Sequence, residues 1–369
     1  MNFLKKIILF GIIMVTSILG FSLSVNANEV GFSVEPVLPN NQIDAQSGYF
    51  HLLMKQGDSQ KLQVKLKNTK DQEVKLTAWV ASAKTNVNGV VDYSDNKSEV
   101  DDSLQHDLSQ LVEIEKDIVL PPNSEKIIDV IVKMPEARVE GIIAGGLTFE
   151  EKKASETENI SSQTGIKNKF SYVIALLIQQ EKEITIEPEL SIGKVEPTQL
   201  NTKSAISAEI RNVTSVFLNN MSIAVKITDK NSKEVIFEED KTNLQMAPNT
   251  TMNFPLFLNG KKLEPGKYHY EAFISGTNGS DEADSKEWEL SSDFTIEKEV
   301  AKELNKTDTQ QKDEKTLSWW VWLLIISNIL LVVALVTFLV LKIKKVKKLK
   351  RKRNVRRKRK NKKCAVDIS

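Results

Sequence analysis

Apolar and polar residues alternate with a period of two along most of the chain between residues 28 and 317. One such run contains Leu62, Val64 and Leu66, and another begins at Ile223. A period of two places successive side chains on opposite faces of a strand, so each run predicts a half-buried β-strand. No comparable stretch shows a sustained 3.6-residue period, and turn residues recur between the runs. The pattern therefore predicts an all-β region of antiparallel sandwiches, in preference to barrels.

A second feature is an uncharged run of 23 residues, Trp319 to Leu341. At about 1.5 Å per residue, a helix of this length spans the ~30 Å hydrocarbon core of a bilayer. The residues after it, 342–369, hold sixteen Lys or Arg and one Asp, whereas residues 28–341 hold 33 basic and 48 acidic residues. Basic residues on one flank only mark that flank as cytoplasmic. We predict a transmembrane helix at 319–341, a basic cytoplasmic tail at 342–369 and an extracellular portion before them.

The N-terminus carries a targeting feature of its own. Two lysines precede an apolar run, Ile7 to Phe21, and small residues follow it up to Ala27, which predicts a secretory signal peptide at 1–27. No cysteine stands near the cleavage site, so we expect no lipid anchor there. The one cysteine, Cys364, lies in the predicted cytoplasmic tail. An exported region of this size without disulfides is typical of bacteria, and the absence of a barrel pattern favours a Gram-positive one.

Two stretches with little to bury divide the exported portion. Residues 151–168 and 298–318 are polar or charged and hold almost no large apolar residues, so neither can offset its own ordering entropy. We predict a first domain at 28–150, a linker at 151–168 and a second β-sandwich at 169–297. Residues 298–318 are then a juxtamembrane stalk.

Weak internal repetition relates these two modules. Asn68 follows a strand in the first module as Asn212 does in the second, and Asn123 and Asn249 stand in turns that introduce a later strand. The separation is 55 residues from Asn68 to Asn123 in the first module and 37 residues from Asn212 to Asn249 in the second. The additional residues fall around 81–104 and include a polar turn of hairpin type. We interpret them as an exposed excursion, and loops are where binding usually occurs.

Patterns for catalysis or metal binding are hard to place in the exported portion. His51, His106 and His269 are widely separated and form no His-x-x-His or His-Glu-x-x-His arrangement. Acidic pairs such as Asp101-Asp102 are better explained as solvated surface than as the two carboxylates of a glycosidase. The basic tail begins at the inner end of the predicted span, so anchoring explains it better than nucleic-acid binding. We predict no catalytic residue, no metal, no cofactor and no nucleic-acid partner.

Several short motifs occur in a characteristic order along the exported chain. Their positions in the first module are Phe32, Pro36, Gln42, Tyr49, Phe50, Asn68, Asn86, Gly89, Tyr93, Gly141, Gly145 and Gly146. Those in the second module are Pro248, Asn249, Gly266 and Tyr268. These residues are either fold determinants or binding contacts. In this order the motifs resemble those of the WxL-interacting cell-surface proteins of Gram-positive bacteria, and the resemblance covers roughly residues 29–150 and then most of the remaining exported chain.

The resemblance implies an immunoglobulin-like first domain associated with peptidoglycan and a second domain associated with host or partner proteins. Our leading hypothesis is a non-catalytic, membrane-anchored scaffold that contacts peptidoglycan and WxL-domain surface proteins or host extracellular proteins. A sandwich offers loop aromatics and amides to sugars, and an unpaired sheet edge to a partner strand. One alternative is an adhesin that binds host matrix directly. The other is a wall-modifying hydrolase that uses its scattered acidic residues.

Overall fold

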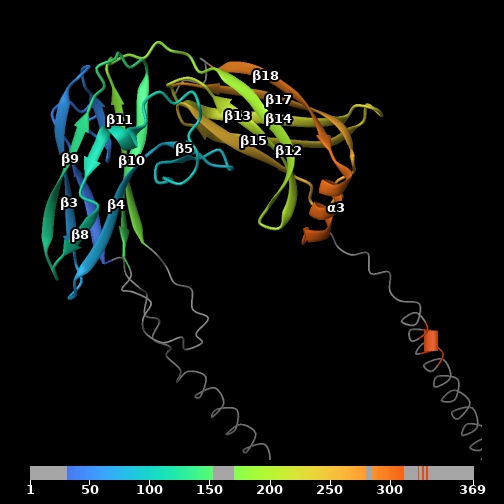
Figure 1. Ribbon diagram of the computed structural model, residues 1–369, viewed down its shortest axis with the longest axis horizontal. Helices are drawn as coiled ribbons and strands as arrows, with labels where there is room; N and C mark the ends of the chain where they lie inside the picture. Colours follow the sequence, from blue (N-terminus) through green and yellow to red (C-terminus); the bar gives the residue numbers. More distant parts are fainter. Residues whose placement is uncertain are drawn as a thin grey trace, which may run out of the picture. The chain divides into compact units, whose positions relative to one another are not determined.

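The computed structural model describes residues 31–152, 170–279 and 285–310, together with Leu323, Ile326, Ser327 and Leu330. Most regular elements of the described part are β-strands, as the alternation predicted (Figure 1). The described residues from 31 to 308 form one compact unit. This unit contains both β modules.

The predicted signal peptide at 1–27 and the basic tail at 342–369 lie outside the described residues. Most of the predicted span at 319–341 does so too, and its four described positions are helical and exposed. Among the described residues, no helix has both the length and the apolar composition needed to cross a membrane.

Two sheets enclose the core of the first module. Their strand orders are β1-β3-β9-β7 and β2-β11-β10-β4-β8. Neighbouring strands are antiparallel except β2 and β11, which are parallel. The strands are β1 (Phe32–Val37), β2 (Phe50–Leu53), β3 (Ser59–Asn68), β4 (Val74–Ser82), β7 (Val112–Ile114), β8 (Asp117–Leu120), β9 (Glu125–Lys133), β10 (Ile142–Glu151) and β11 (Ser171–Gln179), with a short helix α2 (Leu108–Leu111).

The inward faces of these two sheets share one apolar core. Leu62, Val64 and Leu66 of β3 alternate with exposed or half-buried polar residues and are at most 1% exposed. They belong to the same cluster as Leu147 and Phe149 of β10 in the opposite sheet. Burial of each such side chain contributes about 1.5–3 kcal/mol, so the period-two pattern is the main source of stability here.

The second module is built in the same way, with strand orders β12-β13-β16 and β15-β14-β17-β18. Its core includes Phe254 and Tyr270, which are at most 1% exposed. The strands are β12 (Leu190–Leu200), β13 (Lys203–Asn212), β14 (Leu218–Asp229), β15 (Val235–Met246), β16 (Thr250–Phe257), β17 (Gly266–Thr277) and β18 (Lys286–Ile296), followed by helix α3 (Lys298–Thr307).

The predicted linker at 151–168 does not lie between the two modules. Residues 153–169 are outside the described part, but the strands on either side of them, β10 and β11, are antiparallel neighbours in one sheet. The N–H of Glu151 donates to the carbonyl of Phe170 at 3.2 Å. The second module therefore begins after β11 and not at 169. A long polar insertion between paired strands has the same composition as a linker, which explains the difference.

The start of the predicted stalk at 298–318 also folds. Helix α3 covers Lys298–Thr307 and packs Ala301, which is 2% exposed, against the core of the second module. The side chain of Asn305 both donates to the carbonyl of Leu263 at 2.9 Å and accepts from its N–H at 2.8 Å. The few apolar residues of this segment are spaced so that they bury one face of a helix. The low overall hydrophobicity of the segment concealed this spacing in the sequence.

The internal repeat corresponds to a repeated structural motif. The side-chain amide of Asn68 donates to the carbonyl of Pro121 at 2.8 Å, and that of Asn212 donates to the carbonyl of Ala247 at 3.0 Å. Each asparagine thereby ties the end of one strand to the turn before a later strand. The turn in each module holds an asparagine in the left-handed region, Asn123 (φ 48°) and Asn249 (φ 52°).

Candidate binding site at the module junction

The excursion of the first module packs against the second module. Its two short strands, β5 (Lys84–Thr85) and β6 (Val91–Asp92), form a small hairpin. At the hairpin turn, the side chain of Asn86 accepts from the N–H of Asn88 at 2.9 Å, and Gly89 has a φ of 68°. The carbonyl of Gly89 accepts from the N–H of Gln245 at 2.7 Å. The expectation that residues 81–104 form an exposed excursion is therefore wrong where the hairpin contacts the second module.

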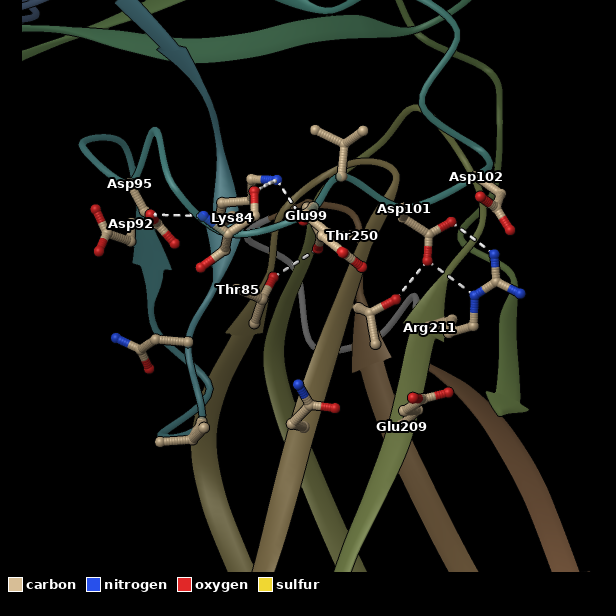
Figure 2. Close-up of a pocket in the computed structure, with 16 residues that line it drawn as sticks. Lys84, Thr85, Asp92, Asp95, Glu99, Asp101, Asp102, Glu209, Arg211 and Thr250 are labelled. Atoms are coloured by element: carbon tan, nitrogen blue, oxygen red, sulfur yellow. Dashed lines mark hydrogen bonds and ion pairs between the residues drawn. The ribbon is translucent and has the colours of Figure 1, made fainter. Parts of the chain in front are cut away.

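Two buried hydroxyl groups join the hairpin to the second module. The Oγ1 atoms of Thr85 and Thr250 are 2.6 Å apart (Figure 2). Thr85 Oγ1 also accepts from the N–H of Ala247 at 3.0 Å, and Thr250 Oγ1 donates to the carbonyl of Ala247 at 2.9 Å. Thr85 therefore donates its proton to Thr250, and every polar group in this buried cluster has a partner.

The excursion makes a second contact with the second module, and this contact is charged. Arg211 donates to both carboxylate oxygens of Asp101, through Nε at 2.8 Å and Nη2 at 2.7 Å (Figure 2). Thr251 Oγ1 and the N–H of Ser103 also donate to this carboxylate. Burial alone would raise the pKa of Asp101, but the hydrogen bonds from Arg211, Thr251 and Ser103 hold that pKa well below its usual range. The ion pair likewise raises the pKa of Arg211.

The apolar part of the junction lies on the outer face of the β2-β11-β10-β4-β8 sheet. Ala83, Ala144 and Leu177 pack there with Ala247 of the second module, and Tyr93 covers them in part. Burial raises the pKa of Tyr93 to about 12. The small residues leave room for the excursion, which therefore covers a face that would otherwise expose apolar surface.

Two glycines permit this close approach. A Cβ on Gly146 would lie 2.5 Å from the carbonyl oxygen of Tyr93. A Cβ on Gly141 would lie 2.3 Å from the carbonyl oxygen of Ser215, and Gly141 also has a φ of 80°. That carbonyl accepts from the N–H of Ile142 at 2.8 Å. Glycine is needed at both positions because backbone of another segment occupies the space of a side chain.

The junction thus brings together motif positions from both modules. Those at or beside it are Tyr49, Asn86, Gly89, Tyr93, Gly141, Gly146, Pro248 and Asn249. The other motif positions lie elsewhere. In the first module, Phe32, Phe50 and Gly145 are in the core, Pro36 is on β1, Asn68 is in its turn and the side chain of Gln42 donates to the carbonyl of Tyr49. Gly266 and Tyr268 are in the second module, where Tyr268 stacks on Phe294.

A pocket of about 720 Å³ lies between the excursion and strands β13 and β16 (Figure 2). Its two basic groups are engaged, because Arg211 binds Asp101 and Lys84 Nζ donates to the carbonyls of Ser98 and Glu99. Burial lowers the pKa of Lys84. The acidic residues that line the pocket are Asp92, Asp95, Glu99, Asp101, Asp102 and Glu209.

Two of these acidic groups remain available to a ligand. Within the described ranges, the carboxylates of Glu99 and Asp102 make no ion pair and no hydrogen bond, and both residues are exposed. Thr251 and Asn253 add hydroxyl and amide groups to the wall. The pocket therefore suits a polar ligand group that carries hydrogen-bond donors and positive charge.

The histidines occupy separate settings. His51 contacts Gln179 at 3.0 Å, His269 contacts Asp293 at 2.7 Å, and His106 lines a different pocket. In the part of the chain that the structure describes, no group of three or more His, Cys, Asp or Glu is placed to hold a metal ion.

Sequence reasoning missed the polar contacts of the junction and assigned Asp101 to solvated surface. The Asp101 side chain is 1% exposed, because the second module covers it. One signal was available: where the repeat has Lys67 before Asn68 in the first module, it has Arg211 before Asn212 in the second. Arginine is the residue suited to a bidentate bond with a carboxylate, so this difference indicated a fixed acidic partner.

The fold and the junction define an all-β protein of two modules that are joined by the excursion of the first module. Residues 32–151 match the family described as WxL Interacting Protein, peptidoglycan binding domain. Residues 161–306 match WxL Interacting Protein, host binding domain. The chain belongs to the WxL Interacting Protein family, as its motifs predicted, and these two domains support a cell-surface binding role.

Other comparisons add little. A comparison with curated proteins gave no match. Among solved structures, the Class 5 fimbriae chaperone CfaA is 13% identical, with 70% of this chain and 98% of that chain covered and a TM-score of 0.29. The E. coli chaperone DraB is 12% identical, with 72% and 97% covered and a TM-score of 0.27.

Proposed function

We propose that this chain is a non-catalytic, membrane-anchored scaffold of the cell surface. Its first module binds peptidoglycan, and its second binds WxL-domain surface proteins or host ligands. Both modules are immunoglobulin-like sandwiches, and residues 319–341 are the anchor. The proposal is supported by the order of the two matched domains and by the uncharged C-terminal run with basic residues on one flank.

The observation that carries the proposal is the fastening of the two binding domains to each other. The contacts of Thr85 with Thr250 and of Asp101 with Arg211 bridge the modules through buried or half-buried groups. A scaffold that holds a wall polymer with one domain and a protein with the other needs such a connection. Without it, the position of one ligand would not constrain the other.

For the wall polymer, we propose the junction pocket as the contact. Most of its acidic lining comes from the domain matched as peptidoglycan binding. Peptidoglycan combines amide and hydroxyl groups with amino groups on its stem peptides. Such amino groups are complementary to the available carboxylates of Glu99 and Asp102.

Cosedimentation of the full-length chain with purified cell wall tests this contact. A Glu99→Gln/Asp102→Asn variant should bind about tenfold more weakly, since two charge-assisted hydrogen bonds are lost. The matched control is Glu73→Gln/Glu115→Gln, which removes the same charge from carboxylates that are paired with Lys75 and Lys126. Equal loss in both variants would show a non-specific charge effect. No retention of the unaltered chain would refute the wall-binding role itself.

The anchor is testable through Cys364, the only cysteine of the chain. If residues 342–369 are cytoplasmic, a membrane-impermeant maleimide should label Cys364 only after cells are permeabilised. A Ser285→Cys/Cys364→Ser variant, with the cysteine just before β18, should be labelled on intact cells. Labelling of Cys364 on intact cells would contradict the proposed orientation.

A further inference from the structure

An exposed aromatic residue stands on the outer face of the larger sheet of the second module. Phe273 on β17 is 48% exposed. Ala224 on β14 and Glu289 on β18 lie directly opposite it on the neighbouring strands, and Asp240 on β15 lies opposite Ala224. The row across the sheet is therefore Asp240, Ala224, Phe273 and Glu289. The small side chain of Ala224 leaves one side of the ring uncovered.

A hollow of about 610 Å³ lies over this row. Asp240, Glu287 and Glu289 line it, and across the described residues none of these three carboxylates makes an ion pair or a hydrogen bond. Lys241 also lines the hollow, but its Nζ contacts Glu239 at 3.3 Å and lies 4.9 Å from the ring centre of Phe254. The hollow thus presents an aromatic ring with uncompensated negative charge around it.

The first module has an exposed apolar residue in a contrasting setting. Ile127 on the outer face of β9 is 57% exposed. Its neighbour Glu125 pairs with Lys65 at 3.0 Å and with Lys67 at 3.1 Å, and its neighbour Asp129 pairs with Lys61 at 3.2 Å. The carboxylates beside Ile127 are neutralised within the sheet, whereas those beside Phe273 are not. Both Ile127 and Phe273 are exposed apolar residues, so exposure alone does not distinguish them. They differ in whether the neighbouring carboxylates are paired with lysines.

We propose that the hollow around Phe273 is a docking site for a cationic segment of a partner protein. An arginine or lysine side chain of the partner lies over the Phe273 ring, where the ring face attracts the cation. Asp240, Glu287 and Glu289 bind this group or its cationic neighbours. Arginine is among the residues that contribute most to the binding free energy of protein interfaces, so a partner arginine buried over this ring would be an anchor of the contact. The inference rests on the proposed partner-binding role of the second module and specifies the chemistry of that partner.

The test uses the full-length chain and a fluorescein-labelled peptide of alternating arginine and serine, with binding measured by fluorescence anisotropy. Phe273→Ala should weaken binding about tenfold, because the cation loses its aromatic contact. Glu287→Gln/Glu289→Gln should weaken binding about as much and reduce its dependence on salt concentration. Ile127→Ala is the matched control and should bind as the unaltered chain does. Phe273 is half exposed, so thermal unfolding should verify that Phe273→Ala is folded.

Two results would overturn the docking site. One is unchanged peptide binding by Phe273→Ala, and the other is equal loss of binding in Ile127→Ala. A pull-down with WxL-domain surface proteins distinguishes failure of the docking site from failure of the proposed function. If the unaltered chain captures them and Phe273→Ala captures them equally well, the docking site is refuted and the partner-binding role stands. If the unaltered chain captures neither these proteins nor the peptide, both are refuted.

Discussion

Asp101 and Arg211 stand 110 residues apart in the chain and form a bidentate ion pair across the module junction. The Asp101 side chain is 1% exposed and the Arg211 side chain 29%. The pair is therefore buried on its acidic side and reaches solvent on its basic side. Removal of the arginine leaves a carboxylate that has lost both water and its cation, so we expect this contact to contribute to holding the excursion in place.

Arg211→Met should destabilise the protein by about 3 kcal/mol, as expected when one partner of a buried pair is removed. Methionine retains most of the aliphatic stem, which limits the loss of packing. The measurement is urea unfolding of the full-length chain. Lys226→Met is the control, because Lys226 is 3.9 Å from Glu271 in a partly exposed pair. That control should change stability by less than about 1 kcal/mol.

The same ion pair predicts a pH dependence. The pKa of Asp101 is lower in the folded protein than the usual value of about 3.9 in an unfolded chain. Its contribution is therefore fully present above that unfolded value and is lost as the pH falls towards the folded pKa. In Arg211→Met the carboxyl of Asp101 becomes protonated at low pH, and the free-energy cost of burying its unpaired charge disappears. The stability difference between the two proteins should shrink between about pH 5 and pH 2. A constant difference would contradict the role assigned to Asp101.

Thr85→Val should also weaken the junction, by about 1–3 kcal/mol, because it leaves the N–H of Ala247 buried without an acceptor. Valine has the shape of threonine, so packing is preserved. Thr250→Val removes the other hydroxyl of the pair. A double-mutant cycle on urea unfolding should give a coupling free energy of about 1 kcal/mol, since the two residues share one hydrogen bond. Additive single effects would show that the two hydroxyl groups act independently.

The sequence allowed prediction of what depends on local pattern. The alternation around Leu62, Val64 and Leu66 identified buried strand faces, because burial repeats every second residue wherever one face of a strand meets a core. The repeat of Asn68 and Asn212 identified an equivalent turn in each module, because each asparagine amide also donates to a carbonyl four residues further on, that of Gln72 or Val216. Both are decided within a short segment and its neighbours.

What depends on distant partners was not predictable. The strand β11 follows a polar insertion and was assigned to the second module, although it pairs with β10. The excursion containing Thr85 and Asp101 was interpreted as exposed, because its polar residues bind groups more than a hundred positions away. A polar residue that faces water and one that faces another module look the same in sequence. Only Arg211, where the first module has Lys67, distinguished them.

Gly146→Ala should separate the excursion from the sheet it covers. The new methyl group would lie 2.5 Å from the carbonyl oxygen of Tyr93, and backbone cannot move aside as a flexible side chain does. Limited proteolysis should therefore cleave the excursion faster in this variant than in the unaltered chain. Gly48→Ala is the matched control, because nothing lies within 4 Å of its added Cβ. Equal protection of the excursion in both variants would show that Gly146 is not needed for the contact.

The two repeated asparagines should differ in what they control. Asn68→Ala and Asn212→Ala should each cost about 2 kcal/mol in urea unfolding, since each removes the side-chain hydrogen bonds that tie a strand end to a later turn. Asn212→Ala removes a hydrogen bond to the carbonyl of Ala247, and the N–H of the same residue binds Thr85 of the excursion. The bonds lost in Asn68→Ala are to a turn that, among the described residues, makes no hydrogen bond with Thr85 or Asp101.

Asn212→Ala should therefore also expose the excursion to proteolysis, whereas Asn68→Ala should leave it protected at equal loss of stability. Amide hydrogen exchange of Thr85 and its neighbours, measured in the same two variants, gives an independent readout of this difference. Asn231→Ala, at an exposed turn position, is the control for both and should change neither property. If both asparagine variants exposed the excursion equally, the effect would follow global stability, and the proposed connection from Asn212 through Ala247 to Thr85 would be wrong.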